Sequence, residues 1–208
     1  MADIQHQSQG QRAIAYLRQH GMARLSELKA EGIAEETVSR LVRAGNVLRL
    51  TRGLYQLADA DYQAEQTLAE ASKMVPKGVI CLVSALQYHG LTVQLPSAVW
   101  MAIGQTDRKP KIDYPPIKIV RFAESALELG IEKHKISGVE VRIYDPAKTV
   151  VDCFRYRNKI GIDVALEGLR EAIRTHKALP NDIVRYARSR RIWTVIKPYL
   201  EAVMSDDS

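Results

Sequence analysis

The stretch AEETVSRLVRAGNVLRLTRGLYQL, residues 34–57, decides the fold of the N-terminal part of this chain. Its first half places Val38, Leu41 and Val42 at the i, i+3, i+4 spacing of one helical face. Gly45 follows where such a helix would end, because glycine adopts the backbone conformation of a C-terminal stop without strain. The first half therefore predicts a helix with one apolar face.

The second half of the stretch predicts a β-hairpin. Apolar and polar side chains alternate over residues 47–51, and a turn containing Gly53 leads into a second extended run, residues 54–57. Upstream, helical patterns cover residues 11–20 and 25–30, each closed by a glycine. Three short helices followed by a hairpin are the elements of a winged helix-turn-helix, in the order which that fold requires.

The chain is expected to contain two domains. Residues 1–57 form the winged helix-turn-helix DNA-binding domain, residues 58–63 form a linker, and residues 64–208 form a C-terminal domain. In the latter, helices are expected at 64–74 and 79–89, strands at 98–103, 117–122, 131–136 and 139–144, and further helices after Asp145 and at 181–190 and 192–204. The predicted class is α+β: a winged helix-turn-helix followed by a mixed α/β domain with antiparallel strands and then a helical tail.

Composition excludes several classes of protein. No apolar run approaches the roughly 20 residues of a membrane span, and residues 1–10 are polar, without the apolar core of a signal peptide. Two cysteines are too few for a disulfide scaffold or a four-cysteine zinc site. A cytoplasmic protein is therefore expected. The net charge of +6 allows an anionic partner without identifying one.

Arginines on the predicted third helix and hairpin point to DNA. Arg40 and Arg43 lie one helical turn apart, so both guanidinium groups can reach one groove and bond a guanine edge or a phosphate. The candidate DNA-contacting residues are Arg24, Ser26, Glu36, Thr37, Ser39, Arg40, Arg43, Arg49 and Arg52. The alternative interpretation is an ordinary solvated face, and the Glu35–Glu36 pair mildly favours it because carboxylates repel phosphates.

A second basic tract lies near the C-terminus. It consists of Arg185, Arg188, Arg190 and Arg191, and Trp193 follows it. Such a tract could bind a second stretch of DNA, the phosphates of an RNA or an acidic protein surface. It could equally be a solvated helix end with Trp193 packed in the core, or with one arginine stacked on the indole ring.

Patterns for catalysis or metal binding are weak. Ser84 and His89 are five residues apart on one predicted helix, so they point in different directions and cannot form a hydrolytic triad with Asp152. The histidines are scattered, without metal-ligand spacing. Asp145 and Asp152 could in principle hold Mg²⁺, but Asp145 before Pro146 is better explained as a helix N-cap. No catalytic residue, metal ion or cofactor is expected.

Several motifs resemble the AbiEi-type antitoxins of type IV toxin–antitoxin systems. In that family the third helix leads through a glycine into a basic wing that closes on Arg-Gly-Val/Leu-Tyr, and a later strand leads into a helix ending in Thr-(apolar)₂-Asp. The matching stretches are LVRAGNVLRLTRGLY (41–55), VSALQYHGLT (83–92), QLP (94–96), VRIYDPAKTVVDCF (141–154) and GIDVALE (161–167). Ala34 departs from the usual capping serine, and Lys148 stands where arginine is commoner.

The resemblance, which covers roughly residues 10–175, implies a transcriptional autorepressor that binds operator DNA and acts in abortive infection, a phage defence. It also implies that the C-terminal domain counteracts a nucleotidyltransferase-like toxin without forming a stable complex with it. Such a repressor is expected to bind an inverted repeat, with two winged helices brought together on the DNA. Two alternatives stay open: a nucleic-acid-processing enzyme with chemistry near Asp145 and Asp152, and a ligand-sensing regulator.

Overall fold

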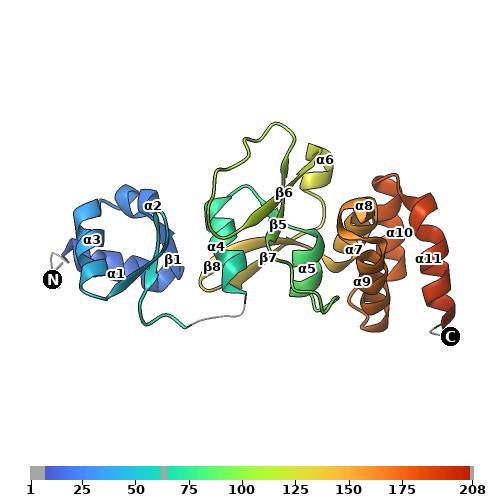
Figure 1. Ribbon diagram of the computed structural model, residues 1–208, viewed down its shortest axis with the longest axis horizontal. Helices are drawn as coiled ribbons and strands as arrows, with labels where there is room; N and C mark the ends of the chain where they lie inside the picture. Colours follow the sequence, from blue (N-terminus) through green and yellow to red (C-terminus); the bar gives the residue numbers. More distant parts are fainter. Residues whose placement is uncertain (1–7, 62–64, 207–208) are drawn as a thin grey trace, which may run out of the picture. The chain divides into compact units, whose positions relative to one another are not determined.

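The structure is a computed structural model that describes residues 8–61 and 65–206 (Figure 1). Residues 1–7, in the polar N-terminus, and residues 62–63, in the expected linker, lie outside the described residues. The chain forms two compact units: residues 1–74 with 135–140, and residues 75–134 with 141–208.

The first unit contains a three-stranded sheet, the helices α1, α2 and α3 that pack on it, and a fourth helix, α4. Its elements are α1 (Gln9–His20), β1 (Met22–Arg24), α2 (Leu25–Ala30), α3 (Glu35–Arg43), β2 (Val47–Thr51), β3 (Leu54–Leu57) and α4 (Gln66–Met74). The strand order is β1-β3-β2 and both pairings are antiparallel. The predicted helices and hairpin are confirmed. Strand β1 was not predicted, because three residues between two helices are too few to show a period-two pattern.

The core of the first unit explains why these short helices are stable. Apolar side chains of α1, α2 and α3 pack together with those of the sheet and the loops; they are Ala13, Leu17, Ala23, Leu28, Ile33, Val38, Leu41, Val47, Tyr55 and Leu57. Helices of this length are marginal in isolation, so most of their stability comes from this burial. The apolar stripe of α3 predicted from its spacing is confirmed, with Val38 and Leu41 buried and Val42 half-buried.

The second unit combines a five-stranded sheet with a layer of helices (Figure 1). Its elements are β4 (Val79–Ile80), α5 (Leu82–Tyr88), β5 (Val99–Gly104), β6 (Ile117–Phe122), α6 (Glu124–Leu127), β7 (Ile131–Ile136), β8 (Val139–Tyr144), α7 (Pro146–Arg155), α8 (Arg157–Ile160), α9 (Ile162–Arg174), α10 (Pro180–Ser189) and α11 (Trp193–Asp206). The end of β7 and the start of β8, residues 135–140, belong to the first unit. The strand order is β6-β5-β4-β8-β7. An α+β architecture is thus confirmed.

Two expectations about the second unit were wrong in detail. The sheet is mixed and not antiparallel throughout, because β5 pairs with β6, and β4 with β8, in parallel. Residues 105–116 connect β5 to β6, and a connection of about a dozen residues is long enough to bring the chain back for parallel pairing. The helix expected over 79–89 begins only at Leu82, because Val79 and Ile80 pair with β5.

The helical layer packs on α7, the most deeply buried helix of the unit. Val150, Val151 and Phe154 are fully buried, as their predicted inward stripe requires. Helices α5, α9 and α10 pack against α7, and α11 packs against α9. Across residues 8–61 and 65–206 there is no helix with both the length and the apolar character that a membrane crossing needs.

Candidate nucleic-acid interface

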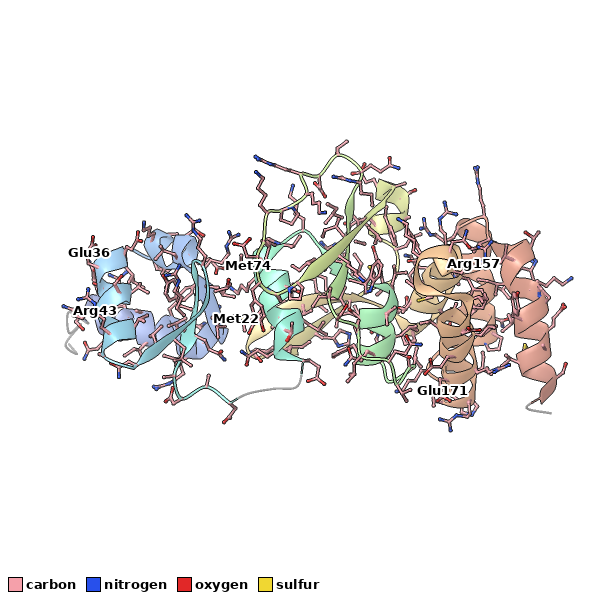
Figure 2. All side chains as sticks on the ribbon, in the orientation of Figure 1. Met22, Glu36, Arg43, Met74, Arg157 and Glu171 are labelled. Carbon is pink, nitrogen blue, oxygen red and sulfur yellow. The ribbon has the colours of Figure 1, made fainter. Side chains whose placement is uncertain are left out.

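Helix α3 carries a polar stripe opposite its buried face. Glu36, Ser39, Arg40 and Arg43 are exposed at positions i, i+3, i+4 and i+7, so they line one side of the helix. Figure 2 shows Glu36 and Arg43 near the two ends of α3, both on the side facing away from the sheet of the unit. Two guanidinium groups in the second half of such a stripe provide donors for a base edge or for phosphates.

The start of α3 is held by a side chain from α1. Ala34 occupies the N-cap position and offers no side-chain cap, as its sequence predicts. The Gln9 side chain replaces that cap: its Oε1 accepts hydrogen bonds from the Ala34 backbone N–H at 3.1 Å and from the Thr37 hydroxyl at 3.0 Å. Lys29 of α2 also pairs with Glu35 at 2.7 Å. These contacts fix the direction of α3 and therefore of its polar stripe.

Thr37 does not lie on the exposed side of α3. It was expected there with Glu36 and Arg40, but its side chain is 8% exposed and is bonded to Gln9. The physical reason is its spacing, since Thr37 and Leu41 are an i, i+4 pair and share the side of the helix that faces α1. Of the α3 residues in the candidate set, Glu36, Ser39, Arg40 and Arg43 are accessible to a ligand.

The β2–β3 hairpin presents two more arginines. Arg49 and Arg52 are both exposed, and Arg52 begins the turn. Gly53 completes the turn with φ +75°, a conformation that costs glycine little. Its carbonyl accepts a hydrogen bond from the Leu25 backbone N–H at 2.8 Å, which ties the hairpin tip to the start of α2. The tip is thereby held in place while its arginine side chains stay at the surface.

The same bond brings the candidates at the start of α2 beside the hairpin tip. Arg24 is half-buried in β1, and its backbone N–H donates to Glu27 Oε2 at 2.6 Å. Ser26 is exposed. Since Leu25 bonds Gly53, Arg24 and Arg52 are drawn to the same end of the unit. The first unit therefore offers two basic surfaces, the α3 stripe and the hairpin end, on the elements that a winged helix uses for DNA.

The segment that builds both surfaces has known relatives. Residues 11–58 match the AbiEi antitoxin family of transcriptional regulators. The match starts within α1 and ends just after β3, so every candidate residue of α2, α3 and the hairpin lies inside it. The resemblance to AbiEi antitoxins expected from the sequence is thus confirmed over this segment.

The fold of the whole chain is similar to that of a solved structure, the crystal structure of RV2827C protein from Mycobacterium tuberculosis. The two share 12% sequence identity, and the alignment covers 97% of this chain and 79% of that chain with a TM-score of 0.63. At this identity the similarity shows the fold alone. No curated protein matches the chain.

Outside the AbiEi match, the structure separates the four arginines of the C-terminal tract. Arg185 is exposed and pairs with Asp182 at 2.8 Å. Arg188 is exposed, with its guanidinium carbon 5.8 Å from the centre of the Trp193 ring, and Arg191 is exposed. Arg190 was expected in the same patch, but it turns inward and is 11% exposed. The exposed tract thus has three arginines, and Trp193 packs against the core.

Arg190 turns inward because a buried carboxylate attracts it. Its Nε donates to Asp152 Oδ1 at 3.1 Å, and Lys148 Nζ bonds the other carboxylate oxygen. Lys148 and Asp152 are both fully buried. The Lys148 ammonium lies 3.9 Å from the centre of the Tyr144 ring and 4.8 Å from that of Phe122. We call these three ionic residues, Lys148, Asp152 and Arg190, the buried ion cluster.

Sequence reasoning missed the buried ion cluster, although it contains a signal. Lys148 and Asp152 stand four residues apart in a helix whose neighbouring residues are apolar, which is the spacing of an internal ion pair. Burial lowers the pKa of Lys148, while Asp152 opposes that shift. The contribution of Arg190, 38 residues beyond Asp152, has no local signature.

The residues considered for enzymatic chemistry have other partners. Asp145 caps α7 by accepting from the Lys148 backbone N–H at 2.7 Å, and its second oxygen accepts from the Tyr186 hydroxyl at 2.6 Å. The Ser84 hydroxyl accepts from the Trp100 backbone N–H at 3.0 Å. His89 Nε2 donates to the Tyr144 carbonyl at 2.7 Å and does not bond a carbonyl of its own helix. Burial lowers the pKa of His89.

The described part of the chain contains no group of three histidine, cysteine, aspartate or glutamate side chains placed to hold a metal ion. Cys81 and Cys153 are free and buried, and burial raises the pKa of both thiols. A thiol with a raised pKa is a weak nucleophile.

Proposed function

We propose that this protein is the antitoxin and transcriptional autorepressor of a type IV toxin–antitoxin operon. In this proposal residues 1–57 form a winged helix-turn-helix that binds operator DNA, residues 58–63 are the linker, and residues 64–208 counteract a nucleotidyltransferase-like toxin. The carrying observation is the exposed stripe of α3, with Arg40 and Arg43, inside the segment that matches AbiEi antitoxin regulators.

The two basic surfaces support a division of roles in DNA binding. The α3 stripe has the width of a single helix face, which fits a major groove, and its arginines read base edges. Arg24, Arg49 and Arg52 at the hairpin end contact flanking phosphates, and Ser26 adds a hydroxyl donor. Glu36 accepts from cytosine, while Ser39 bonds base or phosphate. Two copies on an inverted repeat would satisfy the two-fold symmetry usual for such sites.

The C-terminal domain, residues 64–208, is proposed to act against the toxin without chemistry of its own and without a stable complex. The bonding of the two aspartates supports this: all four carboxylate oxygens of Asp145 and Asp152 already bond protein groups. A nucleic-acid-processing enzyme using that pair would first have to break these bonds. Abortive infection against phage in the cytoplasm is the setting that the proposal implies.

The decisive experiment measures binding to the DNA upstream of the protein's own operon. A fluorescent duplex of that region and a scrambled duplex of equal length are titrated with the full chain, and anisotropy gives the two affinities. Arg40→Ala and Arg43→Ala should each cost about 1–3 kcal/mol of specific binding if the guanidinium groups bond bases. Arg170→Ala, which removes an exposed guanidinium from α9, is the matched control and should bind as the wild type does.

Two results would overturn the proposal. One is equal affinity for the upstream and scrambled duplexes, which would remove sequence-specific repression. The other is full operator binding by the Arg40→Ala, Arg43→Ala double variant, which would remove α3 as the reading helix. Whether a nucleotidyltransferase-like gene adjoins this one, and whether co-expression of this protein rescues growth from its product, tests the antitoxin half separately.

A further inference from the structure

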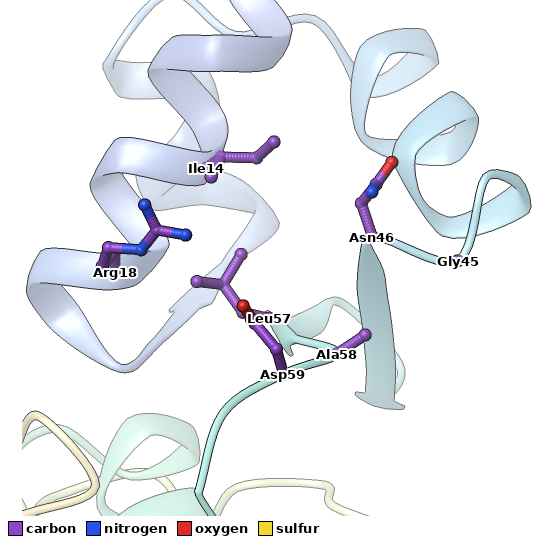
Figure 3. A pocket seen from close by; sticks show the side chains of 7 residues that line it. All are labelled: Ile14, Arg18, Gly45, Asn46, Leu57, Ala58 and Asp59. Atoms are coloured by element: carbon purple, nitrogen blue, oxygen red, sulfur yellow. The ribbon is translucent and has the colours of Figure 1, made fainter.

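A pocket of about 210 Å³ opens on the first unit (Figure 3). Its lining residues are Ile14, Arg18, Gly45, Asn46, Leu57, Ala58 and Asp59. Three parts of the chain supply them: helix α1, the turn that follows α3, and the end of β3 with the segment that leaves it. None of the lining residues belongs to the candidate DNA-contacting set, so the pocket is a separate feature of the unit.

The walls of the pocket are fixed by backbone hydrogen bonds. The Ala58 N–H donates to the Asn46 carbonyl at 3.0 Å, which joins the segment leaving β3 to the turn after α3. The Asn46 N–H in turn donates to the Leu41 carbonyl at 3.0 Å, so the turn is held to the last turn of α3. Leu57 is buried and Ile14 half-buried, and they form an apolar floor. The pocket is therefore largely preformed.

Two opposite charges lie on the rim. Figure 3 shows the Arg18 guanidinium and the Asp59 carboxylate both directed toward the space beside Leu57. Both side chains are exposed, and neither makes a hydrogen bond or ion pair with another residue in the ranges 8–61 and 65–206. Other charged side chains of the unit do, as in the pairs Lys29–Glu35 and Lys73–Glu27. The rim thus offers one free cation and one free anion, within the described ranges, above an apolar floor.

We propose that this pocket binds a free α-amino acid with an aliphatic side chain. Arg18 pairs with its carboxylate, Asp59 pairs with its ammonium group, and Ile14 and Leu57 take its side chain. In an α-amino acid the two charged groups are attached to the same carbon atom, so they lie close enough together to meet two neighbouring rim charges of opposite sign. Asn46, across the pocket, adds an amide that can bond the carboxylate.

The charges and the size of the pocket select this class of ligand. A simple carboxylate would be repelled by Asp59, and a simple amine by Arg18, so only a zwitterion gains from both. The volume lies below the 300–1,000 Å³ typical of pockets for larger ligands, which suits a metabolite of about ten heavy atoms. The pocket includes the turn that ends α3, so a bound ligand would alter the affinity of α3 for operator DNA. That consequence rests on the proposed function.

The test is calorimetric titration of the full chain with L-leucine in the absence of DNA. We expect saturable one-to-one binding. Arg18→Gln and Asp59→Asn should each weaken it by roughly tenfold or more, because each removes one charge-assisted contact. Asp61→Asn is the matched control: it removes an exposed carboxylate two residues away that does not line the pocket, and should leave binding unchanged. Circular dichroism confirms that the variants are folded.

Two analogues of leucine test the zwitterion requirement directly. 4-Methylpentanoate lacks the ammonium group, and isopentylamine lacks the carboxylate, so each should bind at least roughly tenfold more weakly than leucine. The absence of saturable binding with leucine, isoleucine, valine and methionine overturns the inference. So does wild-type affinity in both Arg18→Gln and Asp59→Asn. Since no DNA is present, these failures are distinct from a failure of operator binding.

Discussion

Arg43 on the first unit and Arg190 on the second carry the same guanidinium group in opposite surroundings. Arg43 is exposed on α3, and no contact in the described structure uses its charge. The Arg190 side chain is 11% exposed and bonds Asp152, and its guanidinium carbon lies 5.0 Å from the centre of the Phe122 ring. An exposed guanidinium can bind a ligand without losing a contact within the protein, whereas a buried one would have to leave the carboxylate that it neutralises. The comparison shows that clustered arginines in a sequence do not by themselves mark a binding surface.

The two regions also differ in how the chain stabilises them. The first unit holds the starts of its helices with single hydrogen bonds from other elements. The Gln9 side chain accepts from the backbone at the start of α3, and the Gly53 carbonyl accepts from the backbone at the start of α2. The second unit joins α7 to the end of α10 through the buried ion cluster. Loss of a cap leaves a group that water can reach, but loss of a buried carboxylate leaves charges without a partner.

The largest effect is expected from removing the carboxylate of the buried ion cluster. Asp152→Ala leaves Lys148 and Arg190 buried without a counter-charge and should lower the free energy of unfolding by about 3–5 kcal/mol. Urea unfolding followed by circular dichroism measures it. Asp113→Ala, which removes an exposed carboxylate, should stay within about 0.5 kcal/mol of the wild type. Equal stability of the two variants would contradict a structural role for the cluster.

A smaller difference in stability is expected between alanine variants of two arginines at the C-terminal end of α10. Arg190→Ala removes a charge-assisted bond to a buried carboxylate and should cost about 2–3 kcal/mol. Arg188→Ala removes an exposed guanidinium 5.8 Å from the Trp193 ring centre and should cost about 0.5–1 kcal/mol. The same urea titrations compare them. A larger loss of stability in Arg188→Ala than in Arg190→Ala would contradict the assignment of Arg190 as the buried side chain and Arg188 as the exposed one.

On the first unit, replacing the hairpin arginines should change the salt dependence of DNA binding more than its sequence specificity. If Arg49 and Arg52 contact phosphates, each alanine variant weakens operator and scrambled DNA by a similar factor. The slope of log affinity against log salt concentration should fall by about 0.9 for each lost phosphate contact. Anisotropy titrations at several potassium chloride concentrations give the slope. An unchanged slope in the double variant would remove the hairpin from the interface.

The smallest effect concerns His89 and pH. Its pKa is lowered in the folded protein, chiefly by burial, so protonation is easier in the unfolded chain. A group with a lowered folded pKa contributes stability above its unfolded value near 6.5 and loses it as pH falls below that value. Stability should therefore decrease between pH 7.5 and 5.5, and His89→Gln should flatten that decrease. Parallel slopes in both proteins would exclude His89 as the titrating group.

Much of the local structure could be predicted from the sequence, because it depends on neighbours in the chain. The apolar spacing of α3, the alternation in β2 and the Asp145 cap on α7 are patterns within a few residues. The parallel pairing of β5 with β6 could not be predicted, because it depends on how residues 105–116 cross back. The short β1 was missed for a related reason: its pairing with β3 defines it, not its own pattern.

The candidate interface divides in the same way. The sequence alone determined that arginines gather on a helix and a hairpin within the stretch that resembles AbiEi antitoxins, because helical spacing and turn residues are local properties. Only the tertiary structure decided that Thr37 bonds Gln9, that Arg190 forms an ion pair with Asp152, and that Arg18 and Asp59 line the same pocket. Each of these outcomes depends on a partner from another element, and burial or pairing of a side chain is set by contacts between elements that spacing along the chain does not encode.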